Sequence, residues 1–175
     1  RMNAISSPDL SGGSFSVDAG VILEQLHQSL EGAGVIFPMH LGSEGSAQVG
    51  GLIATNAGGS HAFRYGMMQE LVLGLEVVLA DGTIWNGMRA VQKDNAGYQL
   101  RKLFCGSEGT LGIVTRAILK LSTEPKQQLT ALLAVRDASG LVKLATKLRA
   151  EGGEFLRAME FFSDVGLGIA LENIP

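Results

Sequence analysis

Two glycine-rich segments carry the strongest chemical signal in the sequence. The first is Val49-Gly50-Gly51-Leu52-Ile53-Ala54-Thr55-Asn56-Ala57-Gly58-Gly59, and the second runs from Gly106 to Gly112. Glycine has no Cβ, so such a backbone can approach a flat ring or a diphosphate closely, and successive N–H groups can converge on anionic oxygens. A tight crossover between packed elements needs the same residues. Composition alone therefore leaves a binding role and a structural role both open.

Other catalytic signatures are absent from the sequence. It contains no Gly-x-Gly-x-x-Gly after an expected strand, no Gly-x-x-x-x-Gly-Lys-Ser/Thr, no Gly-x-Ser-x-Gly and no His-Glu-x-x-His. These absences argue against nicotinamide binding on a Rossmann fold, P-loop chemistry, α/β-hydrolase catalysis and zinc proteolysis.

The three histidines, His27, His40 and His61, lie apart in the sequence. We interpret each as a satisfied or solvated structural side chain rather than a metal ligand, and we expect no metal site. The single Cys105 excludes an intramolecular disulfide and any cysteine-based zinc site.

Two groups of polar residues allow a catalytic interpretation beside a structural one. Lys93, Asp94 and Tyr98 could form an acid/base cluster, but their place in a loop before a short helix favours capping and packing. Arg64 could pair with a substrate carboxylate, although a structural salt bridge or a diphosphate contact suits it equally well.

Hydrophobic periodicity predicts the elements that position these segments. Alternation predicts a strand over 14–20, and apolar residues at helical spacing predict a helix from Ile22 to Leu30 that ends at Gly32 and Gly34. The segment 42–59 admits no long regular element. The apolar run 71–80 predicts a central strand, and Asp81-Gly82 predicts a tight hairpin with a type I′ turn.

The second half of the chain continues the alternation of strands and helices. We expect a short helix over 99–104 and a strand over 113–121, with Ile113, Thr115, Ala117, Leu119 and Leu121 on one face. A boundary is expected near 122–128. Beyond it, strands are predicted over 129–135 and 154–162, a helix capped by Asp137, and a further helix starting at Asp164.

Composition sets the broad class of the chain. The 175 residues are 46% hydrophobic with a mean hydropathy of +0.22, so a folded chain is expected rather than a disordered one. A net charge of −3 without a dense Lys/Arg run argues against nucleic acid as a partner, and no stretch is long and apolar enough for a membrane span. Both ends look cut, so we expect a segment of a longer protein.

The order of the motifs resembles a known family. Gly42-Ser43-Glu44-Gly45-Ser46, the segment Gly50 to Gly59 and Arg64-Tyr65-Gly66 resemble the flavin-binding domain of FAD-linked oxidases of the vanillyl-alcohol oxidase (PCMH-type) superfamily. The segments 72–82, 93–98 and 106–115 are similar to the branch that holds D-2-hydroxyglutarate dehydrogenase, cytochrome-type D-lactate dehydrogenases and the glycolate oxidase D subunit. The resemblance covers about residues 1–121 and extends more faintly into the tail.

This resemblance implies an α+β fold in two parts. Residues 1–123 correspond to the larger subdomain of the FAD-binding domain, with a mixed or antiparallel sheet flanked by helices, and residues 124–175 to the start of a ferredoxin-like cap domain. In the family, hydride passes from C2 of a D-2-hydroxy acid to flavin N5, and the base would lie outside this segment. The family's Pro-Arg-Gly-Gly-Gly-Thr-Gly-like diphosphate loop has no counterpart here, so the isolated chain is expected to be inactive.

The resemblance also implies a set of FAD-binding residues: Pro38, Gly42, Ser46, Val49, Gly50, Gly51, Ala54, Asn56, Gly58, Gly59, Tyr65, Gly109, Gly112, Ile113 and Val114. Asn56 is expected to offer its side-chain amide to a polar edge of the flavin. The implied partners of the parent protein are a 2-hydroxy acid and an electron acceptor, and a homo-oligomer is allowed. The expected location is cytoplasmic, or mitochondrial in a eukaryote. The alternative is a non-catalytic α/β binding or assembly module that has lost the flavin.

Overall fold

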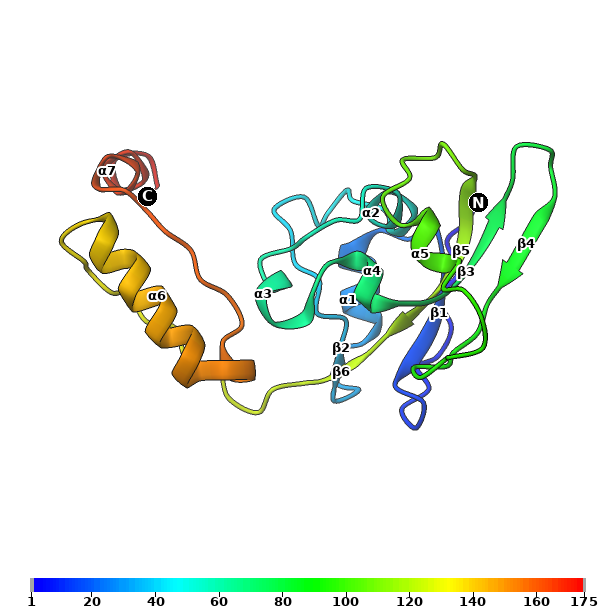
Figure 1. Ribbon diagram of the computed structural model, residues 1–175, viewed down its shortest axis with the longest axis horizontal. Coiled ribbons are helices and arrows are strands. Elements are labelled where there is room, and N and C mark those ends of the chain that lie inside the picture. Colours follow the sequence, from blue (N-terminus) through cyan, green and yellow to red (C-terminus); the bar gives the residue numbers. More distant parts are fainter. Residues whose placement is uncertain (1, 175) are drawn as a thin grey trace.

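The computed structural model describes residues 2–174 and is built around a four-stranded antiparallel sheet (Figure 1). Its strand order is β1-β5-β3-β4, formed by β1 (Ser14–Asp18), β5 (Ile113–Lys120), β3 (Val72–Val78) and β4 (Ile84–Gly87). A second, two-stranded sheet pairs β2 (Val35–Ile36) with β6 (Ser122–Thr123). The antiparallel sheet with flanking helices confirms the expected α+β class.

The first strand and helix follow the sequence pattern closely. Phe15, Val17 and Ala19 alternate along and just after β1, and all three are buried. In α1 (Leu23–Ser29), Leu23 and Leu26 lie one turn apart and are fully buried, so both elements present one apolar face to a common core.

The hairpin between β3 and β4 is confirmed, but its expected turn type is wrong. The N–H of Leu79 donates to the carbonyl of Thr83 at 2.9 Å, which leaves a three-residue loop, Ala80 to Gly82. Only Gly82 in that loop has a positive φ, at 84°, whereas a type I′ turn needs two such residues. Asp81 instead accepts a hydrogen bond from the Thr83 N–H at 2.9 Å through its side chain.

A β-bulge in β5 changes which of its side chains face the core. Glu76 pairs with Arg116 but the next residue, Val77, pairs with Val114, so Thr115 is an extra residue in the ladder. Such an insertion moves the following side chains to the opposite face. Ala117 and Leu119 are therefore buried as expected, whereas Val114 replaces Ile113 and Thr115 on the core side and Ile113 is 59% exposed. The expected single face from Ile113 to Leu121 is wrong at its first two members.

Four short helices occupy the connections between the strands: α2 (Val49–Ala54), α3 (Ala62–Tyr65), α4 (Met68–Leu71) and α5 (Arg101–Phe104). The last confirms the short helix expected over 99–104. Val49, Leu52 and Ile53 of α2 are buried against the sheet, where α2 packs on β5 and β1. The six-residue α2 is thus the only regular element within the small-residue segment 42–59.

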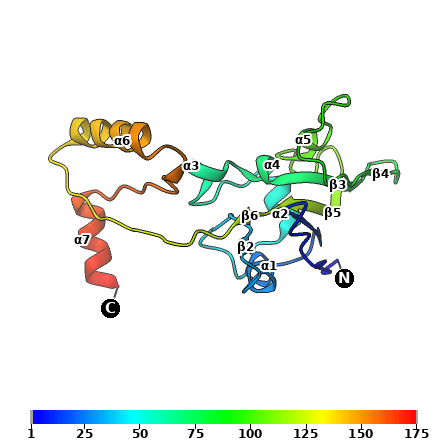
Figure 2. The ribbon, with the colours of Figure 1, turned by 90° about the horizontal axis from the view of Figure 1, so that it is seen from below.

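The tail after β6 lies apart from the sheet. Figures 1 and 2 show α6 (Ala138–Gly152) and α7 (Asp164–Asn173) at one end of the long axis, joined to the body by extended chain. The carboxylate of Asp137 accepts from the Gly140 N–H at 2.7 Å, which confirms the predicted cap. The helix expected to start at Asp164 is also confirmed, and the Ser163 hydroxyl caps it by accepting from the Gly166 N–H at 3.0 Å.

The strands predicted over 129–135 and 154–162 are wrong. Neither segment pairs with another strand among residues 2–174, and a short 3-10 helix, Gly153–Phe155, overlaps the start of the second. No residue from 122 to 174 is buried. A strand needs a partner for its backbone groups, and the extended segments of the tail have none there. Among residues 2–174, no helix is both long and apolar enough to cross a membrane.

We expect amide hydrogens of residues 124–174 to exchange at least roughly 1,000-fold faster than those of β3, because an isolated helix such as α6 is marginal in water. Exposed apolar side chains such as Leu129 (98% exposed) and Phe155 (80% exposed) lack the packing that slows exchange. Hydrogen exchange read by mass spectrometry tests this expectation. Protection of the tail equal to that of β3 would contradict the open arrangement.

Cys105 supplies a chemical probe of packing at the end of α5. Burial raises the pKa of its thiol to about 11. Since the thiolate is the nucleophile, alkylation by iodoacetamide at pH 8 should be about 100-fold slower than for an exposed cysteine and should rise up to pH values near 11. The urea-unfolded chain is the control, and equal rates for folded and unfolded chains would show that the thiol is exposed.

Candidate functional site

A hollow of about 320 Å³ lies between α2 and the loop that enters β5. We call it the glycine-lined hollow. Its wall includes seven of the residues implicated in cofactor binding, namely Gly50, Gly51, Ala54, Gly109, Gly112, Ile113 and Val114. These residues come from two segments more than fifty positions apart in the chain. The fold therefore joins the two glycine-rich segments into one concave surface.

Backbone hydrogen bonds hold the two walls together. The C-terminal end of α2 accepts from the second segment: the carbonyl of Ile53 from the Gly106 N–H at 3.0 Å, and that of Ala54 from the Glu108 N–H at 2.9 Å. Glu108 and Gly109 have positive φ values of 50° and 78°, so the loop turns sharply at these two residues, and both line the hollow. The bulge at Thr115 then places Ile113 and Val114 on the wall.

The adjacent glycines of α2 face different surroundings. A Cβ on Gly50 would lie 2.9 Å from the Cβ of Ala19, and the Gly50 N–H donates to the Ala19 carbonyl at 2.7 Å. Gly50 therefore allows the helix to touch the end of β1. A Cβ on Gly51 would meet nothing within 4 Å. Packing within the chain does not explain Gly51, which lines the glycine-lined hollow.

Three more of the residues implicated in cofactor binding, Gly42, Gly58 and Gly59, line a second hollow of about 480 Å³. His40, Glu44 and Glu160 also line it. A Cβ on Gly59 would overlap the carbonyl oxygen of His40, so this glycine permits a close crossing of two chain segments.

The other five implicated residues line neither hollow: Pro38, Ser46, Val49, Asn56 and Tyr65. Pro38 and Val49 are buried, and Ser46 is exposed. Asn56 has a positive φ of 47°, and its amide oxygen accepts from the Gln69 N–H at 2.9 Å. That oxygen therefore braces the start of α4, and a flavin role for these five stays a prediction.

The two polar groups with alternative interpretations show structural contacts. Asp94 accepts from the Ala96 N–H at 3.0 Å and pairs with Arg89 at 3.6 Å, while Tyr98 is 94% exposed. Asp94 thus acts as a loop cap rather than a member of an acid/base cluster. The guanidinium of Arg64 lies 5.0 Å from the centre of the Tyr65 ring, a cation–π contact at the surface.

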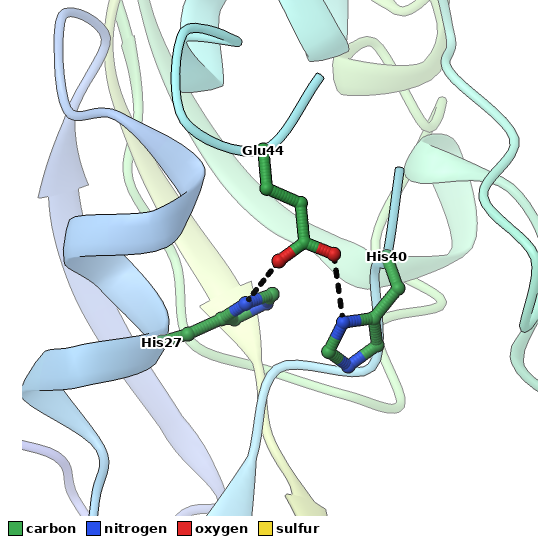
Figure 3. Close-up of side chains that lie close together, drawn as sticks. All are labelled: His27, His40 and Glu44. Carbon is green, nitrogen blue, oxygen red and sulfur yellow. Dashed lines mark hydrogen bonds and ion pairs between the residues drawn. The ribbon is translucent and has the colours of Figure 1, made fainter. Parts of the chain in front are cut away.

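The three histidines lie apart in the sequence but gather at one place in the structure. Glu44 bridges two of them: His27 Nδ1 lies 3.1 Å from Oε2, and His40 Nδ1 lies 2.9 Å from Oε1 (Figure 3). The His40 ring is 4.5 Å from that of His27 and 4.6 Å from that of His61, centre to centre. Only the i, i+4 spacing of His40 and Glu44 hinted at this in the sequence.

Burial and charge set the protonation of this cluster. Burial, helped by the neighbouring His40, lowers the pKa of His27. Burial and then the positive charge of Arg157, whose Nη2 lies 2.8 Å from His61 Nε2, lower the pKa of His61 to about 4. Burial alone would raise the pKa of Glu44, but hydrogen bonding and charge from His40 hold it below its ordinary value. At neutral pH, His27 and His61 are neutral and Glu44 is an anion.

Comparison with known proteins identifies the relatives of the chain. Residues 1–87 match the model of the FAD binding domain family. The chain is 39% identical over 174 residues to a D-2-hydroxyglutarate–pyruvate transhydrogenase of Saccharomyces cerevisiae, covering 99% of this chain and 35% of that protein. It is 43% identical over 160 residues to a mitochondrial D-2-hydroxyglutarate dehydrogenase of Bos taurus, covering 91% of this chain and 29% of the relative.

Further matches extend the same grouping. A putative mitochondrial D-lactate dehydrogenase of Schizosaccharomyces pombe is 38% identical over 163 residues, covering 93% of this chain and 31% of that protein. Among solved structures, an alkyldihydroxyacetonephosphate synthase superposes with a TM-score of 0.64 at 27% identity, covering 73% of this chain and 22% of the synthase.

The chain spans about a third of the length of the curated relatives it matches. Within that span, the family match covers the first glycine-rich segment and β3 with its hairpin. The sequence and structural likenesses agree: residues 1–87 match the FAD binding domain family, and nearly the whole chain is similar to D-2-hydroxyglutarate and D-lactate dehydrogenases.

Proposed function

We propose that this chain forms part of an FAD-dependent oxidoreductase that oxidises a D-2-hydroxy acid, and that the glycine-lined hollow takes up part of the FAD. The observation that carries the proposal is the open space above Gly51, in a wall built from two distant glycine-rich segments. A glycine that no packing contact explains, facing a hollow, is what close approach of a flat cofactor requires. The family match over residues 1–87 supports FAD as that cofactor.

The residues of this chain would act by shape and backbone polarity. Gly50, Gly51 and Ala54 form one wall of the hollow, and the segment Gly109 to Val114 forms the other. Small side chains admit a planar ring, and the apolar Ile113 and Val114 would keep water away from it. Bound FAD supplies a two-electron acceptor for the substrate's hydride. The role of this chain is to bind and orient that acceptor.

The substrate class rests on the relatives. Those reported above are named for D-2-hydroxyglutarate and D-lactate, two acids with a hydroxyl group next to the carboxylate. Because the chain covers about a third of such proteins, we assign the catalytic base, the substrate-binding cations and the electron acceptor to the rest of the parent protein. Residues 124–175 are then the beginning of its cap, and a mitochondrial location accords with the names of the relatives.

We predict that the purified 175-residue chain retains little FAD but binds added FAD weakly, because the hollow contacts the cofactor from one side. Gly51→Val should weaken that binding by at least roughly tenfold, since a branched side chain would fill the space reserved for the ring. Fluorescence quenching of titrated FAD measures the affinity. Protection of 50–54 and 107–114 from hydrogen exchange locates the binding.

Gly168→Val is the matched control. Gly168 also lies in a helix, and a Cβ there also meets nothing within 4 Å, but it sits in α7 away from the hollow. Its affinity for FAD should equal that of the original chain. Equal affinity of the Gly51→Val chain, or absence of FAD binding by the original chain, would assign the glycine-rich segments to chain crossover alone.

A second prediction concerns the parent protein, expressed with the coding sequence that flanks this chain. Its flavin absorbance should bleach on addition of D-2-hydroxyglutarate, D-lactate or glycolate without oxygen, because hydride transfer reduces the ring. L-2-hydroxyglutarate is the stereochemical control and should leave the spectrum unchanged. A parent that holds no flavin would favour the non-catalytic binding module instead.

A further inference from the structure

The cluster of His27, His40 and Glu44 has the composition of a metal centre. One ligand atom from each residue lies within 4.8 Å of the other two. Two imidazoles and one carboxylate are a common ligand set for zinc and neighbouring first-row metals. His27 lies in α1, whereas His40 and Glu44 lie in the connection between β2 and α2, so the tertiary structure brings His27 to the other two residues.

The spacing of the donor atoms fits an ion between them. The two Nδ1–oxygen separations are 3.1 and 2.9 Å. Two ligands held about 2.1 Å from one metal ion at angles of about 90–110° lie roughly 3.0–3.4 Å apart. A divalent ion could therefore take the place of the protons between Glu44 and the two imidazoles, once the side chains turn so that the three ligand atoms, which lie within 4.8 Å of one another, face the same ion.

The second ring nitrogen of His27 has no partner in the metal-free cluster. Nε2 of His27 is buried and makes no hydrogen bond among residues 2–174. When a metal occupies Nδ1, the proton of the neutral ring sits on Nε2. Metal-ligating histidines ordinarily donate this second N–H to a carboxylate, a backbone carbonyl or water.

His61 is adjacent but differently engaged. Arg157 directs Nη2 at Nε2 of His61 from 2.8 Å, and the same nitrogen lies 3.4 Å from Nδ1. A guanidinium only donates, so it occupies the lone pair that a metal would need. His61 thus offers a control residue of the same type in the same cluster.

The cluster also has an open side. His40 and Glu44 lie on the wall of the second hollow, where Glu160 is a further carboxylate. A centre with three protein ligands that opens into a hollow leaves a position for water or for an anionic oxygen of a ligand.

We propose that His27, His40 and Glu44 form a binding site for a divalent first-row transition metal of the zinc class, with its free coordination position facing the second hollow. The proposal uses none of the residues of the glycine-lined hollow, so metal binding can be tested independently of flavin binding. The competing explanation is a structural one, in which Glu44 simply ties α1 to the segment after β2. Glu44 Oε1 also accepts from the Leu41 N–H at 3.2 Å, as such a tie would.

Zinc titration of the metal-stripped 175-residue chain distinguishes the two explanations. Isothermal calorimetry with ZnCl₂ should show one ion per chain. His27→Gln and His40→Gln should each weaken binding by more than roughly 100-fold, because loss of even an outer partner of a ligand costs about 10–100-fold. His61→Gln should retain the original affinity to within roughly threefold. Circular dichroism verifies that each variant is folded.

A ligand exchange separates coordination from support of the fold. His40→Cys removes the hydrogen bond to Glu44 but supplies a thiolate, which binds zinc well. It should recover most of the affinity that His40→Gln loses, and cobalt bound to it should show a thiolate-to-metal absorption band. Absence of zinc binding by the original chain, unchanged binding by His40→Gln, or equal loss in His61→Gln would overturn the proposal.

Discussion

The double pairing of β5 fixes the positions of both walls of the glycine-lined hollow. β5 is hydrogen-bonded to β1 on one side and to β3 on the other, and α2 packs across β5 and β1. The loop that enters β5 must therefore pass the C-terminal end of α2, whose free carbonyls accept its N–H groups. Residues more than fifty positions apart meet because one central strand has two neighbours.

The bulge at Thr115 adapts this pairing to the hollow. An uninterrupted ladder would place Ile113 toward the core and Val114 outward, by simple alternation. The extra residue reverses that order and gives the strand a local bend, and Thr115 itself is anchored by a hydrogen bond of its hydroxyl to Glu76 Oε1 at 2.8 Å. Val114 therefore contributes an apolar side chain to the core, and Ile113 lines the hollow.

Glycine serves two purposes within a few residues of this chain. Gly50 and Gly59 occupy points where two backbones cross, so a side chain there would collide with protein. A Cβ on Gly51 would meet no atom of the chain within 4 Å, and Gly51 lines the glycine-lined hollow. The three clustered histidines also have different partners: Glu44 contacts His27 and His40, whereas Arg157 contacts His61.

Sequence alone determined the elements whose residues depend on near neighbours. The alternation of Phe15 and Val17, the helical spacing of Leu23 and Leu26, and the Asp137 cap all act over a few positions, and all appear as expected. Both glycine-rich segments were also visible, because unusual local composition is itself the signal. Their order along the chain sufficed to indicate the family and its cofactor.

Only the tertiary structure decided the features that depend on distant partners. The apolar run 129–135 reads as a strand, but among the described residues it has no strand to pair with, so its backbone stays without a ladder. The pairing of β5 with β3 contains a bulge, and this bulge puts Ile113 on the other face of the strand. His27, His40 and His61 come together because three separate segments of the chain pack against one another. The spacing of apolar residues indicates which element a segment can form. The register of its strand pairing, and which distant side chains it meets, depend on the segments that pack against it.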